Sequence, residues 1–366
     1  MALGGGLLAY RGLNKYFLKD FLDKKEIELW KWSKESKFYK TINNSARCLL
    51  CPHGCILKHG ETGGCRARIN KDNKLYSIVY GNPCAVHVDP IEKKPLFHFL
   101  PESRALSIAT AGCNFTCKNC QNWTISQSSP QHTENIDFMP EKVVRNALSY
   151  NCQTIAYTYS EPSVFYEYMY DTSKLAHENK IKNLYISNGY INEEPLRELC
   201  KVIDAANIDL KGFDKNNVLS LTGGDYNHVL RTLKILKQEG VWLEITNLIV
   251  PGYTDDLDKI REMSAWISDN LGGDVPIHFS RFSPQYKLKH LLPTPVKTLE
   301  KAREIALSFG IKHVYIGNVL GKDYENTYCS KGHLCIERKG FSVTKFNLEE
   351  GKCSKCGEKI AGIWEV

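Results

Sequence analysis

Residues 105–123, with the sequence ALSIATAGCNFTCKNCQNW, join an apolar run to a set of regularly spaced cysteines. The run Ala105–Thr110 predicts a buried β-strand. Cys113, Cys117 and Cys120 then follow with the spacing C-x3-C-x2-C. Three thiolates on one loop can hold three irons of a 4Fe-4S cluster and leave the fourth iron open. The alternative is a zinc knuckle, but a structural zinc site needs four closed ligands, and no fourth ligand follows nearby in the sequence.

Beyond this motif, short apolar runs alternate with amphipathic stretches, which is the pattern of repeated βα units that build a parallel sheet. In Glu141–Tyr150, for example, Val143, Val144, Ala147 and Leu148 form the stripe by which a helix packs on a sheet. The expected strands are Ala105–Thr110, Thr154–Tyr159, Asn183–Ser187, Asn207–Leu210, Val241–Ile249, Pro276–Phe279 and His313–Ile316. The expected helices are Glu141–Tyr150, Val164–Asn179, Glu193–Ile203, His228–Gln238, Leu257–Asn270 and Val296–Ser308.

Six such units predict an α/β fold, in the form of a partial or full (β/α) barrel. Active sites of such barrels lie at the C-terminal ends of the strands, so chemically active side chains are expected just after each strand. The cysteines outside the motif gather near the two ends of the sequence. We therefore expect a cysteine-rich module at residues 1–100, a barrel core at 101–322 and a zinc-ribbon-like module at 323–366.

Composition narrows the class of protein. The chain is 42% hydrophobic and 24% charged, and no apolar run approaches the roughly 20 residues of a membrane-spanning helix. Met1–Tyr10 lacks the basic region of a secretion signal, so we expect an ordinary terminus and a cytoplasmic protein. The net charge of +7 counts all 14 cysteines as neutral thiols. Metal-bound cysteines are thiolates, so the true charge is less positive, which argues against nucleic acid as a partner.

Several further segments carry a family resemblance. They are DPIEKKPL at Asp89–Leu96, CQNW at Cys120–Trp123, YTYSEP at Tyr157–Pro162, SNGY at Ser187–Tyr190, IDLKG at Ile208–Gly212 and VPGY at Val250–Tyr253. In combination they resemble the radical S-adenosylmethionine (SAM) proteins of the AmmeMemoRadiSam system, which are akin to the pyruvate formate-lyase activating enzymes.

The resemblance implies a radical SAM enzyme with oxidoreductase or lyase-type chemistry. In such enzymes the open iron chelates the amine and carboxylate of SAM, and reductive cleavage gives a 5'-deoxyadenosyl radical that abstracts hydrogen from a substrate. The resemblance also implies an electron donor of the flavodoxin or ferredoxin type, and partner proteins of the AMMECR and MEMO types. It identifies neither the substrate nor the product.

Residues on or just after the C-terminal parts of successive expected strands are the expected cofactor-binding groups. They are Ser160, Glu161, Ser187, Asn188, Asp209, Lys211, Thr246 and His278. Ser160 and Glu161 take the place of a Gly-Gly-Glu motif that meets the methionyl amino group in related activases. Lys211 can reach the cofactor's carboxylate as a point charge. The family usually has an aromatic residue before the third cysteine, whereas this chain has Asn119, which weakens packing around the adenine.

The N-terminal module contains Cys48, Cys51, Cys55 and Cys65. Four thiolates with this spacing suit zinc or a second 4Fe-4S cluster, and the sequence alone leaves both open. His53 lies between these cysteines and is expected to be a bystander.

The C-terminal module resembles a zinc ribbon. Cys353 and Cys356 form a regular C-x2-C-G arm, and Cys329 begins a second, irregular arm. Either Cys335 or His333 completes the expected zinc site. A degenerate ribbon without metal is the alternative.

Two other functions compete with the leading one. The first is a glycyl-radical activase, which abstracts hydrogen from a backbone glycine of a partner enzyme. Those activases are generally compact, whereas this chain adds two cysteine modules. The second is a non-enzymatic iron-sulfur or zinc protein, and the polar groups that follow successive strands argue against it.

Overall fold

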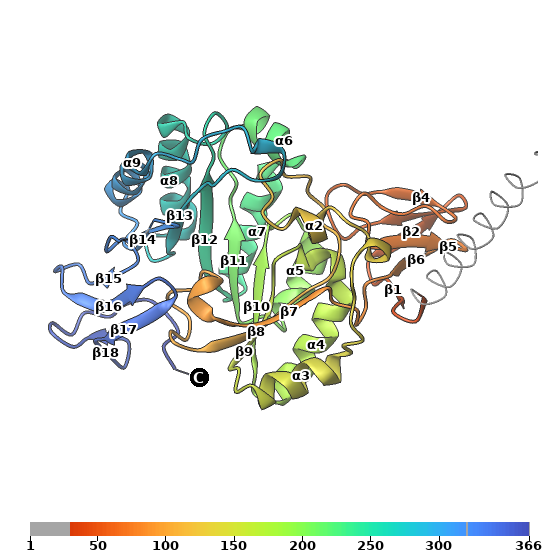
Figure 1. Ribbon diagram of the computed structural model, residues 1–366, viewed down its shortest axis with the longest axis horizontal. Coiled ribbons are helices and arrows are strands. Elements are labelled where there is room, and N and C mark those ends of the chain that lie inside the picture. Colours follow the sequence, from red (N-terminus) through yellow and green to blue (C-terminus); the bar gives the residue numbers. More distant parts are fainter. Residues whose placement is uncertain (1–29, 320, 366) are drawn as a thin grey trace, which may run out of the picture.

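Eight strands form one central sheet in the computed structural model, which describes residues 30–319 and 321–365 (Figure 1). The strands lie across the sheet in chain order, and β7 (Ala85–Pro90) runs antiparallel to β8 at one edge. The other seven are parallel: β8 (Arg104–Ala109), β9 (Thr154–Tyr157), β10 (Lys182–Ser187), β11 (Ala205–Asp209), β12 (Trp242–Ile249), β13 (Ile277–Arg281) and β14 (Val314–Gly317). Because β7 and β14 remain as the edges, the sheet is an open, partial barrel.

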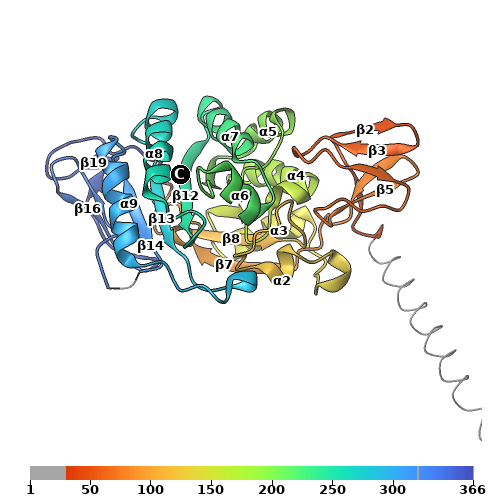
Figure 2. The same cartoon turned by 90° about the horizontal axis from the view of Figure 1, so that it is seen from above.

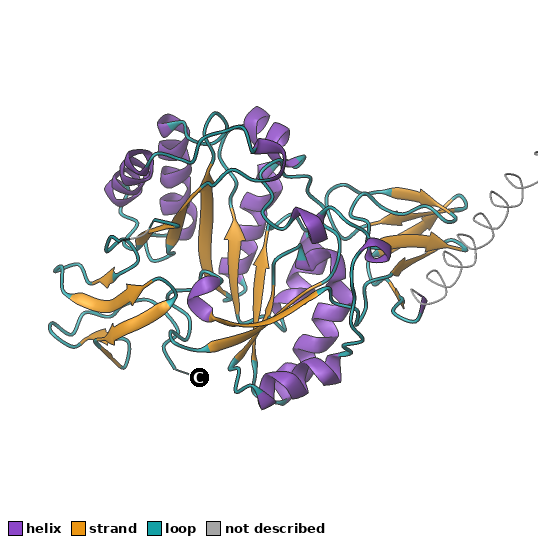
Figure 3. Ribbon diagram, in the orientation of Figure 1, coloured by secondary structure: helices purple, strands orange, loops and turns teal. Residues whose placement is uncertain are grey.

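Helices connect the parallel strands and cover the outer face of the sheet (Figures 2 and 3). Asp214, Asp225 and Asp256 cap three of them by accepting backbone N–H groups of the first turn. The helices are α2 (Trp123–Ser126), α3 (Pro140–Ser149), α4 (Tyr166–Glu178), α5 (Glu193–Cys200), α6 (Lys215–Thr222), α7 (Tyr226–Gln238), α8 (Leu257–Leu271) and α9 (Val296–Ser308). Short 3-10 turns are η1 (Ile91–Lys93), η2 (Pro130–His132), η3 (Pro162–Phe165) and η4 (Tyr286–Leu288).

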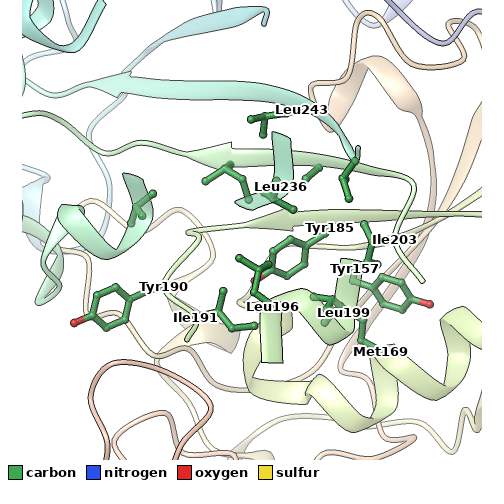
Figure 4. Packing of buried hydrophobic residues seen from close by; sticks show 14 of the residues in the cluster. Tyr157, Met169, Tyr185, Tyr190, Ile191, Leu196, Leu199, Ile203, Leu236 and Leu243 are labelled. Carbon is green, nitrogen blue, oxygen red and sulfur yellow. The ribbon is translucent and has the colours of Figure 1, made fainter. Parts of the chain in front are cut away.

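The main core lies between the sheet and these helices. Tyr157 of β9 and Tyr185 of β10 are fully buried there, beside Met169 of α4 and Leu196 of α5 (Figure 4). β9 is buried on both faces, as expected for a parallel sheet that is covered on both sides. Each such large apolar side chain contributes about 1.5–3 kcal/mol of burial free energy.

The N-terminal module consists of two small antiparallel sheets at one end of the molecule (Figure 1). Its strands are β1 (Lys34–Glu35), β2 (Tyr39–Ile42), β3 (Ser45–Cys48), β4 (Ile56–Lys58), β5 (Arg68–Lys71) and β6 (Lys74–Ser77). Arg68 of this module forms a buried ion pair with Glu167 of α4, with a distance of 2.7 Å between Nη2 and Oε2. The pair fixes the module to the barrel.

The C-terminal module lies at the other end of the molecule (Figure 1). Its strands are β15 (Thr327–Tyr328), β16 (Leu334–Lys339), β17 (Ser342–Phe346), β18 (Leu348–Glu349) and β19 (Lys352–Cys353). The buried Arg338 donates to the carbonyl of Phe97 at 2.7 Å, and Ile363 forms a β-bridge with Phe99. The module is therefore joined to the segment that precedes β8.

The predicted βα series is confirmed, with all seven strands and all six helices within a few residues of their expected limits. Several elements were not expected, and two of them bear on the main sheet. β7 (Ala85–Pro90) joins the main sheet although it precedes the expected barrel core, and α6 adds a helix after β11. Met1–Tyr10 lies outside the described residues. Within the described ranges, no helix combines the length and apolarity needed to cross a membrane.

Candidate active site and metal centres

The three motif cysteines lie on the loop that follows β8. Gly112 opens this loop with φ of +100°, and a Cβ there would lie 2.4 Å from the carbonyl oxygen of Cys65. The backbone N–H groups of Thr116 and Lys118 donate to carbonyls at the end of α6, at 2.8 and 2.9 Å. The loop is thus held from one side by the N-terminal module and from the other by α6.

Hydrogen-bond donors surround the motif thiols. The backbone N–H of Phe115 lies 3.3 Å from Cys113 Sγ, and the Ser126 hydroxyl lies 3.1 Å from Cys120 Sγ. Burial raises the pKa of the Cys113 thiol well above its usual range and that of Cys117 to about 12. The two thiols are therefore protonated at neutral pH unless a metal replaces the proton.

A cavity opens above the motif at the C-terminal ends of the strands. The three motif cysteines line it, as do seven of the eight expected cofactor-binding residues: Ser160, Glu161, Ser187, Asn188, Asp209, Lys211 and Thr246. These residues come from four neighbouring strand ends, as the barrel rule predicts. The rule would also have found Asn318, which lines the cavity just after β14 and was not among the expected residues.

Glu161 is the most heavily bonded carboxylate of this cavity. Its oxygens accept hydrogen bonds from the backbone N–H and hydroxyl of Ser163, the hydroxyl of Ser187 and the backbone N–H of Asn188, at 2.6–2.9 Å. Burial raises the pKa of Glu161, although these four donors oppose the shift. Glu161 therefore ties the ends of β9 and β10 together.

Lys211 supplies a fixed positive charge to the cavity. Its ammonium lies 2.8 Å from the Asp209 carboxylate. Burial opposes the charge, but the Asp209 carboxylate raises the pKa of Lys211 overall. The residue is therefore charged at neutral pH and beside the motif cysteines.

Two buried polar atoms of the cavity lack partners among the described residues. They are the hydroxyl of Ser160 and the side-chain carbonyl oxygen of Asn119. An unpaired buried polar atom costs about 1–3 kcal/mol, so a ligand that satisfies both atoms gains that free energy on binding. SAM presents amine, hydroxyl and adenine N–H groups as donors, and the two unpaired oxygens of this cavity can accept from them.

His278 does not line this first cavity. Its imidazole lies 2.6 Å from the Glu244 carboxylate, and the residue lines an adjoining, larger cavity. Ser160 and Asp209 line both cavities, so the two cavities share a wall. Lys94 also lines the larger one, where burial lowers its pKa to about 8 despite its 2.5 Å ion pair with Asp89.

The C-terminal module brings four ligand atoms together. Those of Cys329, His333, Cys353 and Cys356 all lie within 4.8 Å of one another. The Cys356 and Cys329 sulfurs are 3.8 Å apart, which is about the separation of two sulfurs on one tetrahedral zinc ion with Zn–S bonds near 2.3 Å. Of the two expected fourth ligands, His333 belongs to this group, whereas Cys335 lies outside it and donates its S–H to the His333 carbonyl.

The N-terminal cysteines surround a third cavity, apart from the two already described. Cys48, Cys51, Cys55 and Cys65 all line it, together with Arg68 and Asn114. Burial raises the pKa of Cys48 to about 11 and raises those of Cys51 and Cys65 as well.

Comparison with known proteins identifies the class. Residues 107–266 match the family model of the Radical SAM superfamily. An uncharacterized protein of Methanocaldococcus jannaschii is 48% identical over 89% of this chain and 98% of its own length. Pyruvate formate-lyase 1-activating enzyme of Escherichia coli is 23% identical over 56% of this chain and 89% of its own length. The pyruvate formate-lyase-activating enzyme of Staphylococcus aureus is 29% identical, over 43% and 67% respectively.

Residues 107–266 are a radical SAM domain, and this domain is homologous to pyruvate formate-lyase activating enzymes. Members of this superfamily are enzymes that bind a 4Fe-4S cluster and SAM and take electrons from a reductant.

Proposed function

We propose that this enzyme cleaves SAM reductively in the first cavity and that the resulting 5'-deoxyadenosyl radical abstracts hydrogen from a substrate in the adjoining cavity. The observation that carries the proposal is that the two cavities lie side by side and share Ser160 and Asp209 in their walls. When bound by Cys113, Cys117 and Cys120, the cluster supplies one electron to the sulfonium of SAM. The protein positions both reactants and excludes water.

The residues of the first cavity have separate tasks in this proposal. Lys211 holds the methionyl carboxylate by its charge, and Glu161 faces the methionyl amine while it orders the end of β10. The unpaired Ser160 hydroxyl and Asn119 carbonyl oxygen accept donors of the cofactor. Ser187, Asn188 and Thr246 complete the polar wall, as expected from the sequence.

The adjoining cavity points to a polar substrate. Lys94, Glu92 and His278 line it, and Tyr159 donates a hydrogen bond to Asp89 beside Lys94. We therefore assign His278 to the substrate side instead of the cofactor side. Lys93 also lines this cavity, but the ammonium groups of Lys93 and Lys94 are both already paired with Asp89.

A glycyl-radical activase is the second candidate. Homology to pyruvate formate-lyase activating enzymes favours it. The larger cavity also lies between the segment after β7 and the end of β14, which are the two edges of the open sheet. A protein loop could enter there. Appearance of a glycyl-radical electron paramagnetic resonance (EPR) signal on a partner enzyme would favour this candidate over a small-molecule substrate.

The remaining assignments extend this proposal. The resemblance to the AmmeMemoRadiSam system supports AMMECR-type and MEMO-type partners, a flavodoxin or ferredoxin as electron donor, and a cytoplasmic location. The C-terminal ligand group supports a structural zinc ion held by Cys329, His333, Cys353 and Cys356.

Replacement of Cys113, Cys117 or Cys120 with alanine tests the proposed reaction. After anaerobic reconstitution, each variant is expected to form no 5'-deoxyadenosine from SAM when dithionite is the reductant. The open iron requires all three thiolate ligands. Cys200→Ala, which changes a lone cysteine on α5, is the matched control and keeps the activity. Wild-type turnover in any motif variant would refute the assignment.

A further inference from the structure

The four N-terminal cysteines are arranged differently from the C-terminal metal ligands. Among the described residues, the C-terminal set forms a group of ligand atoms within 4.8 Å of one another, and the sulfurs of Cys48, Cys51, Cys55 and Cys65 form no such group. They line a cavity instead. Four sulfurs on one zinc ion lie about 3.8 Å apart, so this wider arrangement does not suit a single zinc ion.

The motif cysteines provide an internal comparison. In the proposed function Cys113, Cys117 and Cys120 bind three different irons, and within the described chain they too form no group of ligand atoms within 4.8 Å. Like the N-terminal four, they line a cavity. Ligands that each bind a separate iron of a cubane must stand farther apart than ligands that share one ion.

Arg68 adds a second, independent observation. The residue is 2% exposed and lines the N-terminal cavity, and its Nη atoms bond to Glu167 and Ser36. Its Nε has no hydrogen-bond partner among the described residues. A buried N–H without an acceptor points to a missing ligand, and a sulfide or thiolate of a cluster would accept this hydrogen bond.

The N-terminal cavity adjoins the catalytic loop. His53 Nε2 lies 2.8 Å from the backbone carbonyl oxygen of Asn114, the residue after Cys113. The Cys65 carbonyl packs against Gly112, the residue before Cys113. Asn114 itself lines the N-terminal cavity. Two short paths of bonded or touching atoms therefore connect the two groups of cysteines.

We infer that Cys48, Cys51, Cys55 and Cys65 bind a second 4Fe-4S cluster that relays electrons to the catalytic one. In one step, an external low-potential ferredoxin or flavodoxin gives one electron to the second cluster, which changes from the 2+ to the 1+ state. In the next, the same electron passes to the catalytic cluster, and the second cluster returns to 2+. No atom is transferred. The relay and the comparison with the motif cysteines rest on the proposed function, whereas the spacing of the N-terminal sulfurs and the unpaired Arg68 Nε do not.

Metal analysis of the full chain, reconstituted anaerobically with iron and sulfide, tests the second cluster. We expect about eight irons and about one zinc per chain. The triple variant Cys113→Ala/Cys117→Ala/Cys120→Ala should keep about four irons, with an EPR signal that SAM does not change. About four irons and two zincs in the wild type, or no iron in the triple variant, would overturn the inference.

A variant in the N-terminal cysteines keeps the inference testable if the triple variant misfolds. Cys51→Ser/Cys55→Ser should lower the iron content to about four and keep the EPR signal that responds to SAM. The matched control is Cys84→Ser/Cys200→Ser, which removes two cysteines outside the clusters and should keep about eight irons. An unchanged iron content in Cys51→Ser/Cys55→Ser would also overturn the inference.

The relay is tested with two electron sources. In Cys51→Ser/Cys55→Ser, SAM cleavage driven by reduced ferredoxin should be lost, while cleavage driven by dithionite, a small diffusible reductant, should persist. Equal rates with both donors would overturn the relay. Absence of cleavage with both donors in the wild type would contradict the proposed function and leave the iron count as the measure of the cluster.

Discussion

Glu161 and Lys211 both line the first cavity, but they depend on the surrounding protein in different ways. Glu161 is 1% exposed and accepts four hydrogen bonds, whereas Lys211 has a single ion pair with Asp209. A substitution at Glu161 therefore changes the protein as well as the site. A substitution at Lys211 changes mainly the site.

Lys211→Met is expected to leave the cluster and the fold intact and to weaken SAM binding by about ten- to a hundredfold, since a charge-assisted hydrogen bond contributes about 1.5–3 kcal/mol. Methionine keeps most of the side-chain volume. Equilibrium binding of SAM to the reconstituted variant measures the effect. Wild-type affinity would show that Lys211 does not hold the carboxylate.

Glu161→Ala is expected to lower thermal stability together with SAM affinity, because it leaves buried donors of Ser163, Ser187 and Asn188 without an acceptor. Each unsatisfied donor costs about 1–3 kcal/mol. Glu161→Gln retains an acceptor oxygen and is expected to lose less stability. Melting temperatures of the two variants, compared with Lys211→Met, separate the structural role from the cofactor role. Equal stability of all three proteins would contradict the structural role of Glu161.

Sequence reasoning at this scale identified residues but not their partners. Ser160, Asp209 and Lys211 could be placed because each lies at or just after the end of an expected strand. The assignment of His278 by the same rule did not distinguish the two adjoining cavities, because its side chain is held by Glu244 of the neighbouring strand. A contact between residues on two different strands leaves no local pattern in the sequence of either strand.

Among the elements, α6 has a larger role than its short length suggests. Carbonyls at its end hold the cysteine loop, and Gly224 just beyond it packs against the ring of Phe115. The helix was not predicted, because Lys215–Thr222 has few apolar residues and no clear stripe. The strands and longer helices were predictable, since burial imposes a strong period on their sequences.

Gly224→Val tests the contact between α6 and the cysteine loop. A Cβ at Gly224 would lie 2.2 Å from the Phe115 ring, so the ring and its loop must move. We expect a loss of about 1–3 kcal/mol in stability and reduced iron at the catalytic site. Gly64→Ala is the control, because a Cβ at Gly64 meets no atom within 4 Å. Full iron content in Gly224→Val would show that α6 does not set the loop.

At the scale of the whole molecule, the C-terminal module is expected to depend on its metal. Cys353→Ser/Cys356→Ser should lose about one zinc per chain and melt at a lower temperature, because zinc binding free energy is largely folding free energy. Some SAM cleavage should remain, since none of these ligands lines the first cavity. Zinc analysis and thermal unfolding give the measurement. Unchanged zinc content would contradict the ligand assignment.

The interface of this module with the sheet predicts a pH dependence. Burial lowers the pKa of His98 well below its usual range and that of His313 to about 4, although Asp274 opposes the shift at His313. An unfolded histidine titrates near 6.5, so the unfolded chain binds protons first as the pH falls. Stability is therefore fully present above about pH 6.5 and decreases toward pH 4, by about 3 kcal/mol for His313 alone.

Melting temperatures between pH 7.5 and 4.5, with zinc content followed in parallel, measure this dependence. His313→Gln should flatten the profile, because it removes one buried group that must stay neutral. His59→Gln is the control, since His59 is largely exposed. Identical profiles for both variants would contradict the role of His313.

The β-bridge between Phe99 and Ile363 sets an order of events during synthesis on the ribosome. His98 Nδ1 contacts the Ala361 carbonyl across 263 residues, and the Leu100 N–H donates to the carbonyl of Ile363. At about 5–20 residues per second, these partners are made roughly 13 to 50 seconds apart. The segment before β8 must therefore wait without its partner while the whole barrel emerges. In a nascent chain that stops near residue 320, the segment before β8 would stay exposed to chaperones.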